Sequence, residues 1–377
     1  MKYYIIAGEA SGDLHASNLM QEIKQNDNLA EFRCWGGDLM QEKGGTIVKH
    51  YRDLAFMGFA EVIMNIRTII KNIKFCKKDI LNYNPDALIL VDYPGFNLRV
   101  AKFAHAQGYK VFYYISPQIW AWKKSRVFSI KKNIDKMFCI LPFEKDFYAK
   151  YDYKADYVGH PLLDAIKHDE IEKIENKDLN NLIVNDNRKI IALLPGSRKQ
   201  EIKKLLPEMV SIANHFPDYH FIIAGVNWQP KTLYSDIVGS KNISIVYGAT
   251  YHLLKNSYAA LVTSGTATLE TALFNIPQVV CYKANAISYR IAKMVVKGIE
   301  YISLPNLIMN RQVVKELIQK ECNSENLIAE LEKITINKTH REKVFQDYND
   351  LKTKLGSGGA SKKTALLIAN AISDIKK

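Results

Sequence analysis

Twice in this chain, a short apolar run leads into a loop of small residues that opens a helical segment. The first run covers residues 3–7 and continues into the loop 8–13, and the second covers 190–194 and continues into the turn 195–198. A strand that ends in such a turn at a helix N-terminus leaves backbone N–H groups that suit an anion such as phosphate. Two starts of this kind, about half a chain apart, predict two Rossmann-like domains that face each other across a cleft.

Apolar strands alternate with helical stretches along both halves, which predicts an α/β fold with two doubly wound parallel sheets. Near-continuous apolar runs are typical of parallel strands that are buried on both faces. Further runs of this kind lie at 32–35, 87–91, 111–115, 136–140, 220–224, 243–246, 259–262 and 278–281. Residues 167–187 are charged and rich in asparagine, so this segment is the best linker candidate. We therefore expect a first domain at 1–168 and a second domain at 186–354.

The bulk composition excludes several classes of protein. The length of 377 residues accommodates two domains, and the apolar fraction of 47% is that of a soluble globular protein. No apolar run reaches the roughly 18 residues of a membrane span, and the immediate strand after Met1 predicts no signal peptide. The five cysteines are scattered without a Cys-X-X-Cys pair, which favours free thiols in a reducing cytosol. Without an Asp-X-Asp motif, a metal-ligating cluster or a P-loop, we expect no metal and no other cofactor.

The net charge of +13 predicts an anionic partner, such as nucleic acid, a membrane or a phosphorylated small molecule. No helix-turn-helix, zinc-finger or RNP-type signature accompanies the charge, so we do not expect nucleic-acid binding. A lysine-rich composition bias is an alternative source of part of the total. Between 123 and 136, six basic residues accompany one aspartate, and this cluster suits a phosphate-bearing substrate or an anionic bilayer.

Two turns in the second half carry groups that suit a nucleotide. The guanidinium of Arg198 could neutralise a departing diphosphate, because the preceding turn allows close approach of the backbone. Glu270, one turn into the next helix, could accept a hydrogen bond from a ribose hydroxyl. Alternatively, both turns are ordinary surface and capping groups, although together in one domain they favour nucleotide binding. The candidate donor-binding residues are Gly196, Ser197, Arg198, Ser264, Gly265, Thr266 and Glu270.

Asp92 is the leading candidate for a catalytic base, because it directly follows the apolar run 87–91. Catalytic groups in open α/β sheets lie at the carboxyl ends of strands, and a carboxylate there could take a proton from an acceptor hydroxyl. An aspartate that only bonds its own turn backbone is the alternative. Glu9, His15 and His160 are rival candidates.

Two aromatic side chains, Trp120 and Trp122, follow the strand that ends near 115. They line a pocket wall for a sugar or a lipid, or they anchor the core at a domain edge, and the sequence leaves both interpretations open.

Apolar residues recur at helical spacing from 57 to 73, accompanied by lysines and an arginine. A basic amphipathic helix is typical of interfacial membrane contact, whereas a core-facing helix with a solvated face gives the same pattern. If exposed, each large side chain could contribute about 1.5–3 kcal/mol of burial in lipid. The candidate membrane-contacting and acyl-contacting residues are Met57, Phe59, Val62, Ile63, Ile66, Ile69 and Ile70.

Seven short strings occur in one order along the chain, at 8–13, 57–62, 116–122, 141–144, 194–198, 264–270 and 303–307. Each string is weak alone, but the set in register is highly specific. Together they resemble the bacterial lipid-A-disaccharide synthases over essentially the whole chain. Residues 166–187 and 226–242 match poorly, which leaves the linker length and the contacts on the uracil side open.

The resemblance implies a GT-B fold and an inverting, metal-independent glycosyltransferase. Its donor would be UDP-2,3-diacylglucosamine and its acceptor 2,3-diacylglucosamine 1-phosphate (lipid X), giving UDP and a β-1,6 disaccharide. The second domain would hold UDP, with Asn306 added to the donor-binding residues, and Asp92 matches the family's proposed base. The candidate acceptor-binding residues are Ser11, Gly12, Asp13, Asn97, Gln118 and Trp120.

The same resemblance implies a protein that is peripheral to the cytoplasmic face of the inner membrane. The helix near Met57 would meet acyl chains and membrane, and a final helix at about 355–377 would pack back on the first domain. A homodimer remains open. The alternatives are another GT-B UDP-sugar enzyme, such as a UDP-N-acetylglucosamine transferase or 2-epimerase, and a non-catalytic basic membrane-surface protein.

Overall fold

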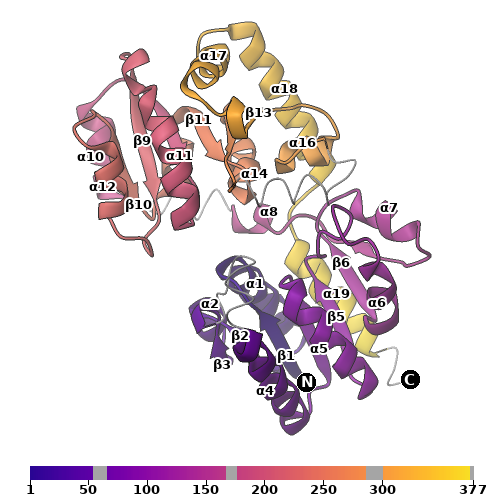
Figure 1. Ribbon diagram of the computed structural model, residues 1–377. Helices are drawn as coiled ribbons and strands as arrows, with labels where there is room; N and C mark the ends of the chain where they lie inside the picture. The colour runs from indigo at the N-terminus through magenta and orange to yellow at the C-terminus, as the bar shows by residue number, and fades with distance from the viewer. Residues whose placement is uncertain (54–65, 167–175, 286–299, 374–377) are drawn as a thin grey trace. The chain divides into compact units, whose positions relative to one another are not determined.

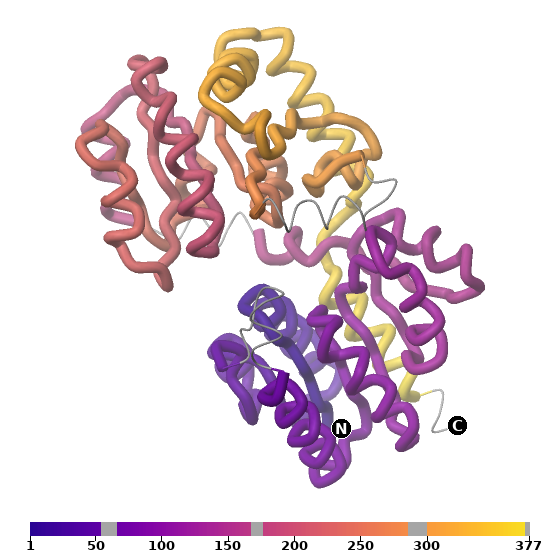
Figure 2. The backbone as a smooth tube through the Cα atoms, in the orientation of Figure 1, coloured from indigo at the N-terminus to yellow at the C-terminus, as the bar shows by residue number. Residues whose placement is uncertain are grey.

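The computed structural model describes residues 1–53, 66–166, 176–285 and 300–373. The chain forms two compact units, one of Met1–Ala165 with Ser357–Lys377 and one of Ile166–Gly356. Figure 1 and Figure 2 show that each unit is a sheet covered by helices on both faces.

Unit 1 is built on a parallel sheet that has seven strands among the described residues, in the order β3-β2-β1-β4-β5-β6-β7. The order reverses between β1 and β4, which is the topological switch point where open α/β sheets bind ligands. Ala7 pairs with Val91 in the register of these two strands, so the loops that follow them leave the sheet side by side. The strands are β1 (Lys2–Ala7), β2 (Glu31–Gly36), β3 (Gly45–His50), β4 (Ala87–Val91), β5 (Lys110–Tyr114), β6 (Lys136–Cys139) and β7 (Asp156–Tyr157).

Helices cover both faces of this sheet, so alternate side chains of the central strands enter two separate cores. Tyr4 and Ile6 of β1 point into one core, and Tyr3 and Ile5 point into the other. The first core is closed by α4 (Ile66–Tyr83), α5 (Pro94–Ala106) and α6 (Arg126–Asn133). The second core is closed by α1 (Ala10–Asn26) and by α19 (Ala360–Ser373), which pack against each other. The shorter helices are α2 (Asp38–Glu42), α7 (Glu144–Ala149) and α8 (Leu162–Ala165).

Unit 2 repeats this plan with a parallel sheet that has six strands in the described part of the chain, in the order β10-β9-β8-β11-β12-β13. Its switch point lies between β8 and β11, where Leu194 pairs with Val262. The strands are β8 (Lys189–Leu194), β9 (Tyr219–Gly225), β10 (Ser244–Tyr247), β11 (Ser257–Thr263), β12 (Gln278–Tyr282) and β13 (Lys315–Ile318).

The helices of unit 2 also divide between the two faces of the sheet. One face is covered by α10 (Lys177–Asn185), α13 (Thr250–Lys255) and α14 (Thr266–Leu273), and the other by α11 (Lys199–Ser211), α12 (Thr232–Val238) and α17 (Ser324–Thr335). Two further helices are α16 (Leu304–Met309) and α18 (Lys338–Leu355). The two parallel, doubly wound sheets confirm the predicted α/β fold class. All five cysteines are buried free thiols.

Candidate functional site

The switch point of unit 1 is formed by two loops in tight contact. A Cβ atom on Gly8 would lie 2.4 Å from two ring atoms of Tyr93, so only glycine allows the two loops to approach this closely. Asp92 and Tyr93 both adopt left-handed backbone conformations, with φ of 43° and 49°. Successive residues of this kind are uncommon outside glycine and cluster at functional sites, where the surrounding structure holds them.

The Asp92 backbone is held from three sides. Its N–H donates to the carbonyl of Tyr114 (3.0 Å), and its carbonyl accepts from the Asn97 amide (2.7 Å) and from the Tyr113 hydroxyl (2.5 Å). Burial, with a smaller contribution from the negative charge of Glu9, raises the pKa of the Asp92 carboxyl to about 6. A carboxylate whose pKa lies close to the working pH is suited to general-base catalysis.

The two rival histidines are poor bases at neutral pH. Both are buried, and burial lowers the pKa of His15 to about 4 and that of His160 to about 3. The His160 Nδ1 atom also accepts from the backbone N–H of Leu162 (3.2 Å). Weakly basic, buried imidazoles cannot compete with Asp92 for a hydroxyl proton.

Two residues that were predicted to bind the acceptor form hydrogen bonds with backbone groups of unit 1. Asn97 is fully buried, and its amide donates to the carbonyls of Asp92 and Val91. Asp13 is also buried, and its carboxylate accepts from backbone N–H groups at the start of α2, among them that of Gly37 (2.7 Å). Both side chains are buried and hold these backbone groups, and direct acceptor contacts through them stay a prediction. Of their neighbours in the loop 8–13, Ser11 is exposed and Gly12 is buried.

The tryptophan loop lies beyond the ends of β5 and β6. Gln118 is exposed, while Trp120 is half-buried and meets Phe143 edge to face, with ring centroids 4.9 Å apart. Trp122 is exposed, and the ammonium group of Lys123 lies 4.4 Å from its ring centroid. The two tryptophans therefore differ in environment.

Glu144 is a buried carboxyl beside this loop that the sequence analysis did not single out. Its carboxylate accepts from the N–H groups of Ile140 (3.2 Å) and Leu141 (3.0 Å), and burial raises its pKa to about 7. The sequence signal that could have identified Glu144 is its position at the end of the otherwise apolar string 141–144.

At the switch point of unit 2, the turn after β8 has a backbone conformation that requires glycine at position 196. Gly196 has φ of 103°, and a Cβ atom there would lie 2.5 Å from the Glu201 carboxylate. Glu201 accepts from the N–H of Arg198 (3.3 Å) and from its guanidinium (3.1 Å), which closes a capping box at the start of α11. Ser197 is exposed and the Arg198 side chain is 57% exposed, so the turn presents a cation beside a helix N-terminus.

The second turn of this switch point follows β11 and opens α14. The Ser264 hydroxyl donates to the carbonyl of Ile302 (3.1 Å), whereas Gly265 and Thr266 are exposed. Glu270 accepts from the hydroxyl of Tyr251 in α13 (2.8 Å), and burial raises its pKa. The pairing of β8 with β11 brings this turn beside the turn 195–198, so the predicted donor residues of both turns gather at one edge of the sheet.

Asn306, the remaining predicted donor residue, lies in α16. It is fully buried, and its amide oxygen accepts from the N–H groups of Val313 (2.7 Å) and Val314 (2.9 Å). Its amide nitrogen donates to the Glu316 carboxylate (2.8 Å). These bonds fix the turn between α16 and β13, and the donor contact of Asn306 stays a prediction.

The predicted membrane helix is described from Ile66 onward as α4, so Met57, Phe59, Val62 and Ile63 lie outside the described residues. Ile66 is 53% exposed, Ile70 is 49% exposed and Ile69 is half-buried. Within the described ranges, no helix is both long enough and apolar enough to cross a membrane.

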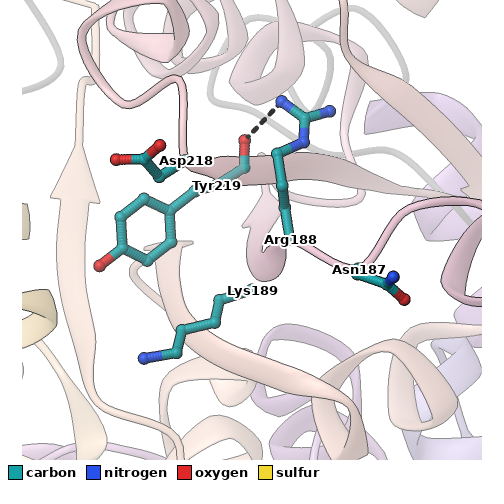
Figure 3. Close-up of a pocket in the computed structure, with 5 residues that line it drawn as sticks. All are labelled: Asn187, Arg188, Lys189, Asp218 and Tyr219. Atoms are coloured by element: carbon teal, nitrogen blue, oxygen red, sulfur yellow. Dashed lines mark hydrogen bonds between the residues drawn. The ribbon is translucent and has the colours of Figure 1, made fainter.

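A shallow cavity of about 480 Å³ lies at the opposite end of the unit 2 sheet, where β8 and β9 begin (Figure 3). The Arg188 guanidinium is bound there by the Asp186 carboxylate (2.6 Å) and by the carbonyl of Tyr219 (3.2 Å). This cavity lies at the amino ends of the strands, whereas ligands of open α/β sheets bind at the carboxyl ends, where the turns 195–198 and 264–270 lie.

Two doubly wound units, each with a glycine-dependent turn at its switch point, have the architecture of the GT-B fold. The solved structures most informative for the fold are a UDP-N-acetylglucosamine 2-epimerase from Neisseria meningitidis and a calicheamicin glycosyltransferase. The epimerase has a TM-score of 0.70 at 14% identity, covering 99% of this chain and 100% of the other. The glycosyltransferase has a TM-score of 0.61 at 11% identity, covering 100% of this chain and 99% of the other.

The chain belongs to the lipid-A-disaccharide synthetase family, whose model matches residues 3–371. A lipid-A-disaccharide synthase of Syntrophus aciditrophicus is 36% identical over 99% of this chain and 97% of the relative. Another, from Persephonella marina, is 36% identical over 97% of this chain and 98% of the relative. These findings confirm the resemblance drawn from the seven strings and the GT-B fold. The chain is a glycosyltransferase with lipid-A-disaccharide synthase activity.

Proposed function

We propose that unit 2 binds UDP-2,3-diacylglucosamine and that unit 1 binds lipid X and activates its attacking hydroxyl. The observation that supports this division of labour is the chemistry at the two switch points. In unit 2, a helix N-terminus and the Arg198 guanidinium suit a diphosphate. In unit 1, Asp92 supplies a carboxylate whose pKa is raised toward neutrality.

The reaction follows from these two groups. Asp92 takes the proton of the acceptor hydroxyl as its oxygen attacks the anomeric carbon of the donor sugar. The bond between that carbon and the diphosphate breaks, and the electron pair leaves with UDP. Arg198 and the N–H groups at the start of α11 stabilise the departing charge. A single displacement inverts the anomeric centre and needs one carboxylate only.

The direct test incubates purified protein with UDP-2,3-diacylglucosamine and lipid X, without divalent metal, and measures UDP and disaccharide. We expect Asp92→Asn to lower kcat by 10²- to 10⁴-fold while UDP affinity stays unchanged, because a general base contributes that much. Asp53→Asn, at an exposed aspartate of unit 1, is the matched control. Wild-type turnover by the Asp92 variant would remove this residue from the mechanism.

The donor half of the proposal is tested by Arg198→Ala. We expect UDP affinity to fall about 10- to 100-fold in titration calorimetry, which is the range for a lost hydrogen bond to a charged group. Lys199→Ala, at the next exposed cation, is the control. The melting temperature should barely change, because exposed ion pairs add little stability. Unchanged UDP affinity would refute the assigned role.

The membrane partner that the family resemblance implies finds support in the helical layer α4–α5–α6 of unit 1. These helices pack side by side over one core, and their single acidic residue, Asp79, is paired with Arg33 (2.7 Å). Ile66, Ile70 and Phe128 are exposed on the same layer. Its exposed cations, including those of the loop before α6, are Arg67, Lys71, Lys74, Lys78, Arg99, Lys102, Lys123, Lys124, Lys131 and Lys132.

An anionic bilayer attracts each such cation by about 1 kcal/mol near its surface. We therefore expect Lys71→Glu with Lys74→Glu to weaken binding to phosphatidylglycerol vesicles by at least about tenfold. Lys338→Glu with Lys343→Glu, on α18 of unit 2, reverses equal charge at exposed positions as a control. Equal vesicle binding by both double variants would contradict the assignment of this face.

A further inference from the structure

The loop 226–230 carries an exposed aromatic side chain beside the anion-binding turn of unit 2. Trp228 follows β9 and is 68% exposed. Its indole N–H donates to the carbonyl of Ser197 (3.2 Å), and the Gln229 amide donates to the same oxygen (3.3 Å). One edge of the indole is thus fixed against the turn, while the ring stays largely in contact with solvent.

Glu270, the carboxylate suited to a ribose, belongs to a helix on the opposite face of the sheet from α11 and α12. Glu270 in α14 is bonded to Tyr251 in α13, and both helices cover the face opposite to α11 and α12. A nucleotide whose ribose meets Glu270 would place its base near the loop after β10, because Tyr251, the partner of Glu270, lies in α13, which directly follows β10. The chain leaves β9 toward α12 on one face and leaves β10 toward α13 on the other.

The loops that follow these two strands approach each other closely. A Cβ atom on Gly225 would lie 2.6 Å from the Tyr247 ring, and one on Gly248 would lie 2.6 Å from the Asn227 amide. The backbone N–H of Val226 donates to the Tyr234 hydroxyl (3.1 Å), which anchors the loop to α12. Trp228 is therefore presented from a braced loop, and a fixed aromatic ring loses little freedom when a ligand stacks on it.

We propose that Trp228 stacks on the uracil base of the donor and so sets part of the nucleotide affinity. The inference rests on the proposed binding of UDP by unit 2. Every base has a flat π-face, and stacking on an aromatic side chain is among the stronger contacts available to it. Because the Trp228 ring is 68% exposed, it contributes little to the core of unit 2.

The test compares Trp228→Leu, which removes the aromatic ring, with Trp228→Phe, which keeps a ring and loses the bond to Ser197. Calorimetry on the full chain measures the binding of UDP and of pyrophosphate, which has no base. We expect UDP affinity to fall about tenfold in Trp228→Leu and no more than about threefold in Trp228→Phe. Pyrophosphate affinity should be equal in all three proteins. UDP should also quench more tryptophan emission in the wild-type protein than in Trp228→Phe.

Three results would overturn the stacking role. Equal losses in both variants, or a parallel loss of pyrophosphate affinity, would mean that Trp228 only braces the turn through Ser197. Unchanged UDP affinity with weaker binding of UDP-2,3-diacylglucosamine would assign the ring to an acyl chain instead. A wild-type protein that binds no UDP would overturn the proposed function itself, so the two failures are distinguishable.

Discussion

The contact between Gly8 and Tyr93 gives a quantitative test of how the fold positions the candidate base. In Gly8→Ala, the new Cβ atom would start 2.4 Å from the Tyr93 ring, whereas ordinary contacts begin at 3.4 Å. The ring, or the loop that carries it, therefore has to shift by about 1 Å. Because Tyr93 directly follows Asp92 and both are in left-handed conformations, the shift is transmitted to the carboxylate.

A displacement of about 1 Å at a reacting group lowers turnover by about 100-fold. We expect this loss in kcat of Gly8→Ala, measured with UDP-2,3-diacylglucosamine and lipid X. UDP affinity should not change, since the substitution lies in unit 1. Overpacking should also lower the free energy of unfolding by about 1–3 kcal/mol.

Gly95→Ala is the matched control, because it lies in the same turn and its new Cβ atom would meet nothing within 4 Å. This variant should keep wild-type turnover. If Gly8→Ala has the same kcat as Gly95→Ala, the close approach of the two loops does not position Asp92 and the reasoning fails.

Three further predictions follow from particular contacts. Because Asp92 has a raised pKa of about 6, kcat/KM should rise with pH up to about 6 and then level off, and Glu9→Gln should move this limb to lower pH. A raised carboxyl pKa costs stability that grows as the pH rises from the ordinary value of 3.8 to about 6 and is constant above that. Asp92→Asn should therefore raise the melting temperature relative to wild type at pH 8 but not at pH 3.5, and an equal shift at both would contradict the burial of this group. Asn306→Ala should lower the free energy of unfolding by about 3 kcal/mol in denaturant titration, since it leaves buried backbone groups unpaired, and a loss below 1 kcal/mol would count against its structural role.

The central strands and both switch-point turns could be predicted from the sequence, because strands buried on both faces are apolar throughout. The edge strands β3 and β7 and the strand β13 were not predicted. Their side chains are mostly half-buried, so no continuous apolar run marks them. Periodicity detects burial, and an edge strand is buried on only part of its surface.

The sequence by itself determined the two parallel sheets, the family and the turns at which the chemistry gathers, because these depend on local patterns of apolar and small residues. Only the tertiary structure decided what individual side chains do there. Asn97, Asp13 and Asn306 lie in the expected motifs, yet packing buries all three and each forms hydrogen bonds with backbone groups. Trp228 lies in a segment without a recognisable motif, yet the fold brings it to Ser197 from 31 residues away. Exposure and hydrogen-bond partners depend on which segments meet in space, and no local pattern records that.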